Sequence, residues 1–242
     1  MTLLFRDDAY LQEAEATVIS SEAEGIRLDQ TLFYPNGGGQ PGDTGTLSWE
    51  GGQIAITDTR KAVPLAEQGS DVLHIVAEGG PLPPPGTRVK LVLDWQRRHR
   101  HMRMHTALHL LCAVVPGAVT GGQVSADRSR LDFDVPSASL DKEQIESRLN
   151  ELIAADHPVR ERLITDADLE ERPELVRTMS VKPPTGSGSV RLLQIGPDDA
   201  LVDLQPCGGT HVARTGEISP ISIVKIENKG KQNRRVIMAF KE

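Results

Sequence analysis

The pattern of apolar residues changes its period near residue 95, and this change constrains the fold more than any other feature of the chain. Before it, short alternating or β-branched runs are separated by Gly, Pro and Asp, a pattern typical of a small barrel or sandwich. The predicted strands cover residues 16–20, 25–32, 46–49, 53–58, 72–77 and 88–95. We therefore expect residues 1–95 to form an N-terminal β-barrel domain.

After residue 95, helical and strand-like patterns alternate. From Arg100, apolar residues recur at three- and four-residue steps until Pro116, which predicts a helix of about four turns. A second amphipathic helix is expected over residues 142–155, with Asp141 as its N-cap. The remaining predicted strands cover residues 119–125, 131–135, 159–165, 190–195, 200–204, 218–226 and 236–240. Residues 96–242 are thus expected to form a two-layer α/β domain with a mainly antiparallel sheet and helices on one side, which makes the whole chain α+β.

Hydropathy and cysteine content limit where the protein works. No apolar run approaches the roughly 20 residues that cross a bilayer, and the first residues do not read as a secretory signal. We expect a soluble, cytoplasmic protein without a membrane partner. Cys112 and Cys207 then stay reduced, which leaves metal binding or simple burial as their roles.

The charge distribution is uneven. A net charge of −7 argues against a general nucleic-acid binder, because neutralising phosphates usually requires a basic surface. Two basic clusters nevertheless stand out, and each is either a solvated face or an RNA contact. The first contains Arg97, Arg98, Arg100 and Arg103, interleaved with His99 and His101; the second contains Lys225, Lys229, Lys231, Arg234 and Arg235.

Two short motifs far apart in the chain carry metal-ligand chemistry. His105 and His109 are four residues apart in the first predicted helix, so both imidazoles project from one face. Cys207 and His211 are also four residues apart, around two glycines that let the backbone fold tightly. Neither pair is specific alone, but together they form an N₃S set suited to one Zn²⁺ ion.

Neighbouring residues offer alternatives to this reading. His101 and Cys112 lie one turn from the histidine pair and could compete as ligands, although a basic entrance and a small buried helix residue are simpler roles for them. The histidine pair also invites comparison with the HExxH metalloproteases. Thr106 stands where those enzymes carry their general-base glutamate, so a protease would lack its base.

A glycine-rich segment in the first domain is the third candidate. It contains Gly37, Gly38, Gly39 and Gln40, shortly after Thr31. Consecutive glycines allow the backbone to approach a ligand closely and to present amides to ribose or phosphate oxygens. An ordinary turn explains the same residues equally well.

Taken in order, these motifs resemble a known family. The segments LDQTLFYPNGGGQPGDTG, HTALHLL, CGGTHV and IVKIENKGKQNRR are closely similar to the editing region of alanyl-tRNA synthetase and to its free-standing relatives, the AlaX-type alanyl-tRNA editing proteins. The likeness runs from about Thr31 to Arg235. The chain shows no trace of the synthetase's aminoacylation domain, so it looks like the free-standing form with an N-terminal barrel.

The resemblance implies a function and a set of site residues. It implies hydrolysis of the ester that joins serine, or glycine, to the acceptor end of tRNA specific for alanine. It implies one zinc ion on His105, His109, Cys207 and His211. Thr31 is expected to meet the seryl hydroxyl, and Gln123 is the nearest match to an editing glutamine. Substrate or tRNA contacts are expected from Gly37, Gly38, Gly39, Gln40, Arg97, Arg98, Lys229, Arg234 and Arg235, and no stable protein partner is implied.

The physical logic of such an enzyme does not depend on its name. A pocket sized for alanine rejects an isostere with an added hydroxyl by little more than ~10², so a second site that binds this hydroxyl improves fidelity. Four protein ligands form a closed set, whereas catalytic zinc usually keeps one open position. We favour a mechanism in which zinc activates water by lowering its pKa; the alternative is that zinc binds the substrate amine. A structural zinc module that only binds RNA, and a zinc hydrolase of small esters or peptides, are the alternatives.

Overall fold

The computed structural model describes residues 1–62, 71–135, 140–179 and 188–241. The chain divides into two compact units, Met1–Arg100 and His101–Glu242. The expected domain boundary at residues 95 and 96 thus lies inside the helix α2 (Trp95–Val114), which begins in the first unit and ends in the second. Within the described residues, no helix combines the length and the apolar character that a membrane span requires.

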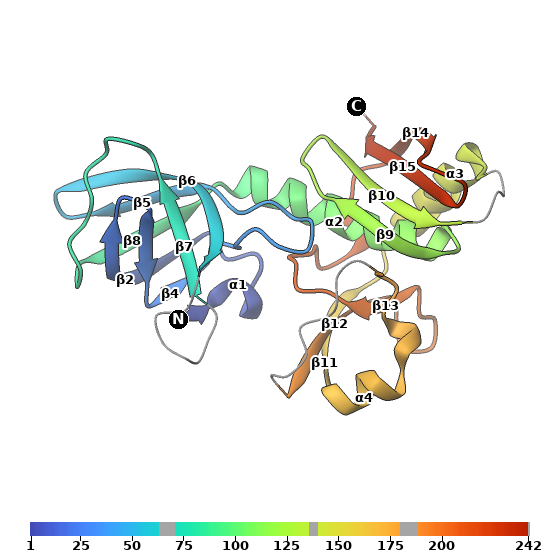
Figure 1. Cartoon of the computed structure of the whole chain (residues 1–242), viewed down its shortest axis with the longest axis horizontal. Coiled ribbons are helices and arrows are strands. Elements are labelled where there is room, and N and C mark those ends of the chain that lie inside the picture. The colour runs from blue at the N-terminus through green and yellow to red at the C-terminus, as the bar shows by residue number, and fades with distance from the viewer. Residues whose placement is uncertain (63–70, 136–139, 180–187, 242) are drawn as a thin grey trace. The chain divides into compact units, whose positions relative to one another are not determined.

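The first unit is built on a closed barrel, as the sequence predicts (Figure 1). Leu47, Leu91 and Phe33, each with none of its surface exposed, belong to the apolar core that fills it. Successive side chains of a strand point to opposite faces, so apolar residues lie inside the barrel and polar residues lie outside. In barrel order the strands are β2 (Glu13–Glu22), β3 (Gly25–Leu28), β7 (Asp71–Val76), β6 (Gly52–Ala62), β5 (Gly45–Trp49) and β8 (Arg88–Leu93). The short strands β1 (Thr2–Leu3) and β4 (Gln30–Thr31) pair in parallel beside helix α1 (Leu4–Asp7).

The second unit contains an antiparallel four-stranded sheet. Its order is β14 (Ile221–Asn228), β15 (Asn233–Phe240), β10 (Arg128–Asp134) and β9 (Ala118–Gln123). Helix α3 (Lys142–Ala154) packs against β14 through apolar residues such as Leu149, which is fully buried. Asp141 caps this helix, as predicted, because its carboxylate accepts hydrogen bonds from the N–H groups of Glu143 and Gln144.

The remaining strands form a separate sheet, and this corrects the prediction of one mainly antiparallel sheet. Strand β12 (Ser189–Ile195) pairs with β11 (Val159–Thr165) on one side and with β13 (Asp203–Pro206) on the other. Both edges of β12 are therefore occupied. In the part of the chain that the structure describes, the strands of the four-stranded sheet pair with one another and not with β11, β12 or β13, so the two sheets stay separate. Helix α4 (Asp166–Glu171) and the 3₁₀ turn η1 (Pro173–Leu175) cover an apolar cluster with this sheet. A second 3₁₀ turn, η2 (Thr215–Glu217), precedes β14.

Candidate metal centre

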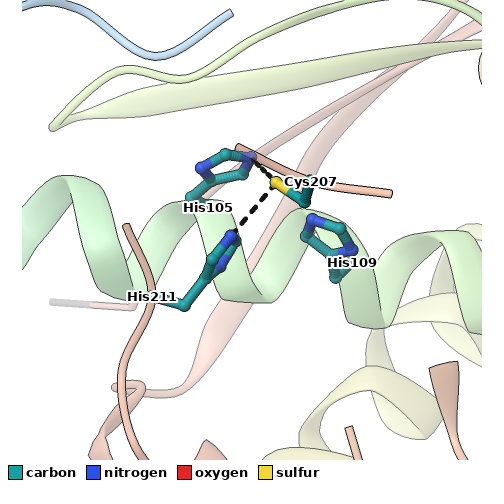
Figure 2. A group of neighbouring side chains, drawn as sticks. All are labelled: His105, His109, Cys207 and His211. Carbon is teal, nitrogen blue, oxygen red and sulfur yellow. Dashed lines mark hydrogen bonds between the residues drawn. The ribbon is translucent and has the colours of Figure 1, made fainter. Parts of the chain in front are cut away.

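Helix α2 and the segment after β13 bring the four predicted ligands together. His105 and His109 project from the same side of α2, while Cys207 and His211 come from the separate CGGTH segment (Figure 2). All three histidines are buried, and Cys207 is half-buried. The ligand atoms of the four side chains lie within 4.8 Å of one another. The two distant motifs therefore converge as the sequence predicts.

The spacing of these atoms fits a tetrahedral ion. The Sγ atom of Cys207 is 3.6 Å from Nε2 of His105 and 3.2 Å from Nε2 of His211. Zinc–sulfur bonds of about 2.3 Å and zinc–nitrogen bonds of about 2.0–2.1 Å, at a tetrahedral angle, place sulfur and nitrogen roughly 3.5 Å apart. A soft thiolate with three imidazoles is also a donor set that zinc favours. The residues thus fit one zinc ion.

Hydrogen bonds behind the ligands fix the imidazole rings. Nδ1 of His109 lies 3.0 Å from a carboxylate oxygen of Asp203, a residue that is itself buried. Nδ1 of His211 lies 3.2 Å from the hydroxyl of Thr106, which donates its own proton to the carbonyl of Met102. Since both acceptors require an N–H at Nδ1, the Nε2 atoms are left to face the site.

The electrostatics of the cluster favour an anionic sulfur. Burial by itself raises the pKa of Cys207, but the three adjacent histidines outweigh it and hold this pKa well below its usual range. Burial lowers the pKa of His109, yet the Cys207 thiolate and Asp203 outweigh that effect and raise it to about 10. For His211 burial prevails, and its pKa falls well below the usual value. The thiolate is the form that binds a metal.

Arg191 holds the CGGTH segment in place. Its guanidinium, on strand β12, donates to the carbonyl oxygens of Cys207 at 2.6 Å and of Gly209 at 3.0 Å. It also pairs with Glu161 on strand β11. Partly buried carbonyl oxygens in an irregular segment need hydrogen-bond donors, and here one guanidinium serves two of them. No sequence pattern had pointed to Arg191.

In the first unit, Thr31 makes a buried polar contact with strand β7 of the barrel. Its side chain is fully buried, and its Oγ1 atom is 2.8 Å from Nε2 of His74 and 3.1 Å from the backbone nitrogen of Phe33. The sequence does not single out His74, because a single histidine in a strand carries no spacing signal. Its contact with Thr31 joins strand β7 to strand β4.

Comparisons with known proteins match both units. The family of the threonyl and alanyl tRNA synthetase second additional domain matches residues 190–237, and that of class II (A) tRNA synthetases matches residues 5–97. The alanyl-tRNA editing protein AlaX-M of Methanosarcina mazei is 39% identical over 243 residues, which span 96% of this chain and 94% of that protein. This chain belongs to the AlaX-M family.

Other relatives agree with this assignment and confirm the resemblance drawn from the motifs. The AlaX-M protein of Saccharolobus solfataricus is 32% identical over 98% of both chains. The alanine–tRNA ligase of Pyrobaculum neutrophilum is 36% identical over 93% of this chain, but over only 25% of the ligase. The AlaX-M proteins thus match this chain over nearly their whole length, whereas the match covers only a quarter of the ligase.

The glycine motif of this AlaX-M family member forms a tight turn. Gly37 and Gln40 exchange two backbone hydrogen bonds, at 3.1 and 3.0 Å. Gly38 and Gly39 between them have φ angles of 58° and 81°, which L-residues with a Cβ rarely adopt in succession. The turn requires glycine at both positions, and both are exposed, whereas the Gln40 side chain is buried.

A buried ion pair anchors the base of this turn and corrects the predicted role of Arg98. Arg98 has none of its surface exposed and pairs with the equally buried Asp43. Asp43 also accepts a hydrogen bond from the backbone nitrogen of Tyr34, whose hydroxyl donates to the carbonyl of Gly37. Arg98 is therefore a structural cation of the barrel and not a surface contact for RNA. His101, expected at a basic entrance, is likewise buried.

The other predicted contact residues differ in the hydrogen bonds that their side chains make within the protein. Arg97 donates to the carbonyl of Gly42 at 2.7 Å. Arg234 donates to the carbonyl of Gly230, in the turn between β14 and β15, and to that of Asn233, the first residue of β15. Arg235 makes two hydrogen bonds, at 2.7 and 2.8 Å, to the carboxylate of Asp132 on β10. Lys229, in the same turn, is exposed.

Gln123 stands at the exposed end of strand β9. Its amide oxygen accepts a hydrogen bond from Nε of Arg130, on strand β10, at 3.3 Å. Strands β9 and β10 pair antiparallel, and they overlap the two strands predicted over residues 119–125 and 131–135. An editing role for Gln123 stays a prediction.

Proposed function

We propose that this protein is a trans-editing deacylase that hydrolyses the ester between serine and tRNA specific for alanine, with glycine as a second substrate. The observation that carries the proposal is the convergence of three imidazoles and one thiolate, with ligand atoms within 4.8 Å, in a chain that matches AlaX-M proteins over nearly its whole length. Those relatives are named for the editing of alanyl-tRNA. The finer substrate assignment to serine rests on Thr31.

The four ligand residues would hold one zinc ion. When bound, zinc supplies a Lewis acid that can polarise the ester carbonyl or lower the pKa of water. The chain's own residues prepare the site: Cys207 contributes a negative charge, while Asp203 and Thr106 hold His109 and His211 by their Nδ1 atoms. Removal of these supports loosens the ligands without removing them.

Discrimination against the correct product follows from one hydrogen bond that the Thr31 oxygen makes with serine and not with alanine. If Thr31 binds the seryl hydroxyl, alanine leaves the buried Thr31 oxygen without that partner, which costs about 1–3 kcal/mol. A roughly tenfold to hundredfold preference for serine follows from this cost. The preference runs opposite to that of a pocket sized for alanine, as an editing site requires.

The proposed partner is the acceptor end of tRNA. The turn of Gly37, Gly38, Gly39 and Gln40 is proposed to meet it through the backbone of the exposed Gly38 and Gly39, because the N–H groups of Gly37 and Gln40 already close the turn. The cations Arg97, Lys229, Arg234 and Arg235 are proposed to meet phosphates. Because its substrate is tRNA, the protein is proposed to act in the cytoplasm. Gln123, which follows helix α2 in the sequence, is proposed as a catalytic residue.

The test is deacylation of defined substrates. Purified protein is incubated with tRNA specific for alanine that carries serine, glycine or alanine, and the release of free amino acid is followed over time. We expect release of serine faster than release of alanine, and loss of both zinc and activity in Cys207→Ala. The matched control is Cys112→Ala, since Cys112 is a buried cysteine outside the ligand set. Full activity of a zinc-free Cys207→Ala protein contradicts the role of zinc.

One observation favours a second candidate, a structural zinc module that binds RNA without turnover. Four protein ligands leave no open position in a tetrahedral site, which is the usual arrangement of structural zinc. Binding of tRNA without release of amino acid from any substrate supports this candidate. Equal turnover of small free esters supports a general esterase instead.

A further inference from the structure

His74 lies among the strands of the barrel, away from the water-exposed surface. It belongs to strand β7, it has none of its surface exposed, and its ring meets Phe33 edge-on at 5.6 Å between centroids. Burying an imidazole without hydrogen bonds is costly, so both ring nitrogens need partners. The two partners are the carbonyl of Ile26 and the hydroxyl of Thr31.

The partner of each nitrogen determines where the single proton of the ring lies. Nδ1 is 2.9 Å from the carbonyl oxygen of Ile26, which can only accept, so Nδ1 carries the proton and donates. Burial lowers the pKa of His74 to about 4, and the carbonyl of Ile26 and the charge of Asp71 only partly oppose this. Asp71 is in turn paired with Arg27. The ring is therefore neutral at neutral pH, and Nε2 offers only a lone pair.

The hydroxyl of Thr31 is oriented by this ring. Because Nε2 of His74 can only accept, the contact of 2.8 Å requires Thr31 to donate its single proton to it. The backbone N–H of Phe33 donates to the same oxygen at 3.1 Å and occupies one of its two lone pairs. One lone pair remains, and it can only accept.

We propose that His74 is a positioning residue that fixes the Thr31 hydroxyl as a hydrogen-bond acceptor, so that the protein selects amino acids whose side chain donates a hydrogen bond. This inference rests on the proposed function. A serine hydroxyl can donate to Thr31, whereas the side chains of alanine and glycine cannot, and the ether oxygen of O-methylserine cannot donate either. Without His74, the Thr31 hydroxyl is free to turn and loses its defined role.

The orientation of the hydrogen bonds can be tested without any substrate. Nitrogen NMR of protein labelled with ¹⁵N-histidine distinguishes the two neutral tautomers and the charged ring. We expect His74 to be neutral with its proton on Nδ1 at neutral pH, and Thr31→Val to shift the resonance of Nε2 while leaving that of Nδ1 nearly unchanged. A proton on Nε2, or a charged ring at neutral pH, overturns the proposal whether or not the protein is an editing enzyme.

The role in selection is tested by kinetics on defined substrates. His74→Leu removes the acceptor at Nε2, while His74→Gln keeps an oxygen that can accept from Thr31. We expect His74→Leu to lower kcat/KM for the seryl ester about tenfold or more and to change kcat/KM for the glycyl ester less than twofold. His74→Gln should restore part of the loss on the seryl ester. The wild-type protein should hydrolyse the O-methylseryl ester at least tenfold more slowly than the seryl ester.

A double-mutant comparison separates this role from plain packing. In the Thr31→Val background, His74→Leu should cause no further loss on the seryl ester, because the residue acts through Thr31. Thermal unfolding of each variant shows that it is folded at the assay temperature. Equal losses on seryl and glycyl esters, or losses that simply add in the double variant, overturn the proposal. If the wild-type protein hydrolyses none of the esters, the proposed function fails and the role in selection fails with it, whereas the NMR result still decides the orientation of Thr31.

Discussion

Asp203 accepts a hydrogen bond from Nδ1 of His109 at 3.0 Å, so a ligand of the candidate metal centre is supported by a buried carboxylate. The same carboxylate oxygen accepts a hydrogen bond from Gln205, and Arg177 lies 4.0 Å from the other oxygen. A carboxylate behind an imidazole fixes the ring and makes it a stronger donor to a metal. Asp203 therefore belongs to the site although it does not face the metal position.

Replacing Asp203 by Asn should weaken metal binding. The substitution keeps the shape of the side chain but removes its charge, and losses of such supports lower metal affinity about 10- to 100-fold. Zinc affinity is measured by competition with a chromophoric chelator. The control is Asp198→Asn, because Asp198 is an exposed acid paired with Arg162. Equal affinities of the two variants contradict the role of Asp203.

The ion pair between Arg98 and Asp43 should dominate the stability of the first unit. Arg98→Met leaves a carboxylate buried without its cation, and breaking a buried pair on one side costs about 3–5 kcal/mol. Urea denaturation gives the free energy of unfolding. The matched control is Arg88→Met, whose exposed pair with Glu15 contributes at most about 1 kcal/mol. Similar losses in both variants refute the interpretation of Arg98 as a structural cation.

Sequence reasoning located the four residues of the candidate metal centre but not the residues that support them. The ligands have a spacing signal, since two pairs each separated by four residues suit one ion. Asp203, Thr106 and His74 act through contacts between elements far apart in the chain, and no local pattern marks such contacts. Thr106 was identified only as a missing glutamate, whereas its hydroxyl orients His211.

The same distinction explains how well the fold could be predicted. The barrel and α3 follow from local periodicity and a capping residue, and the structure confirms both. Helix α2 begins five residues earlier than predicted, because Asp94 accepts a hydrogen bond from the N–H of Arg97 and the polar first turn hides the helical period. The division of the second unit into two sheets depends on which strand edges meet, and strand patterns alone do not determine pairing.

The lysines of the turn between β14 and β15 should contribute to tRNA binding through charge alone. Under the proposed function, Lys229→Ala and Lys231→Ala each reduce the slope of log affinity against log salt by about one, because each loses one phosphate contact. Arg148→Ala, an exposed cation on α3, is the control and should leave the slope unchanged. Filter binding across a salt series measures the slope. An unchanged slope in both lysine variants removes this turn from the tRNA contact.

Arg235 should behave differently from these lysines. Its guanidinium is held by two hydrogen bonds to Asp132, so Arg235→Ala removes both from a partly buried carboxylate and leaves it only the longer ion pair with Arg130, at 3.8 Å. We expect this variant to lower the free energy of unfolding, which neither lysine variant does. Urea denaturation of the three variants checks the difference. A loss of stability in the lysine variants equal to that of Arg235→Ala contradicts it.

His74 should make the protein less stable as the pH falls below neutral. Its pKa is about 4 in the folded protein and about 6.5 when unfolded, so between these values the unfolded chain binds a proton that the folded protein does not. The contribution of the neutral His74 ring to the free energy of unfolding is fully present above pH 6.5. It is lost as the pH falls towards 4, by about 3 kcal/mol in all. Urea denaturation across this range, with His74→Leu as the comparison, measures it. The stability advantage of the wild type over the variant should narrow by about that amount, and a constant advantage shows that burial does not hold the ring neutral.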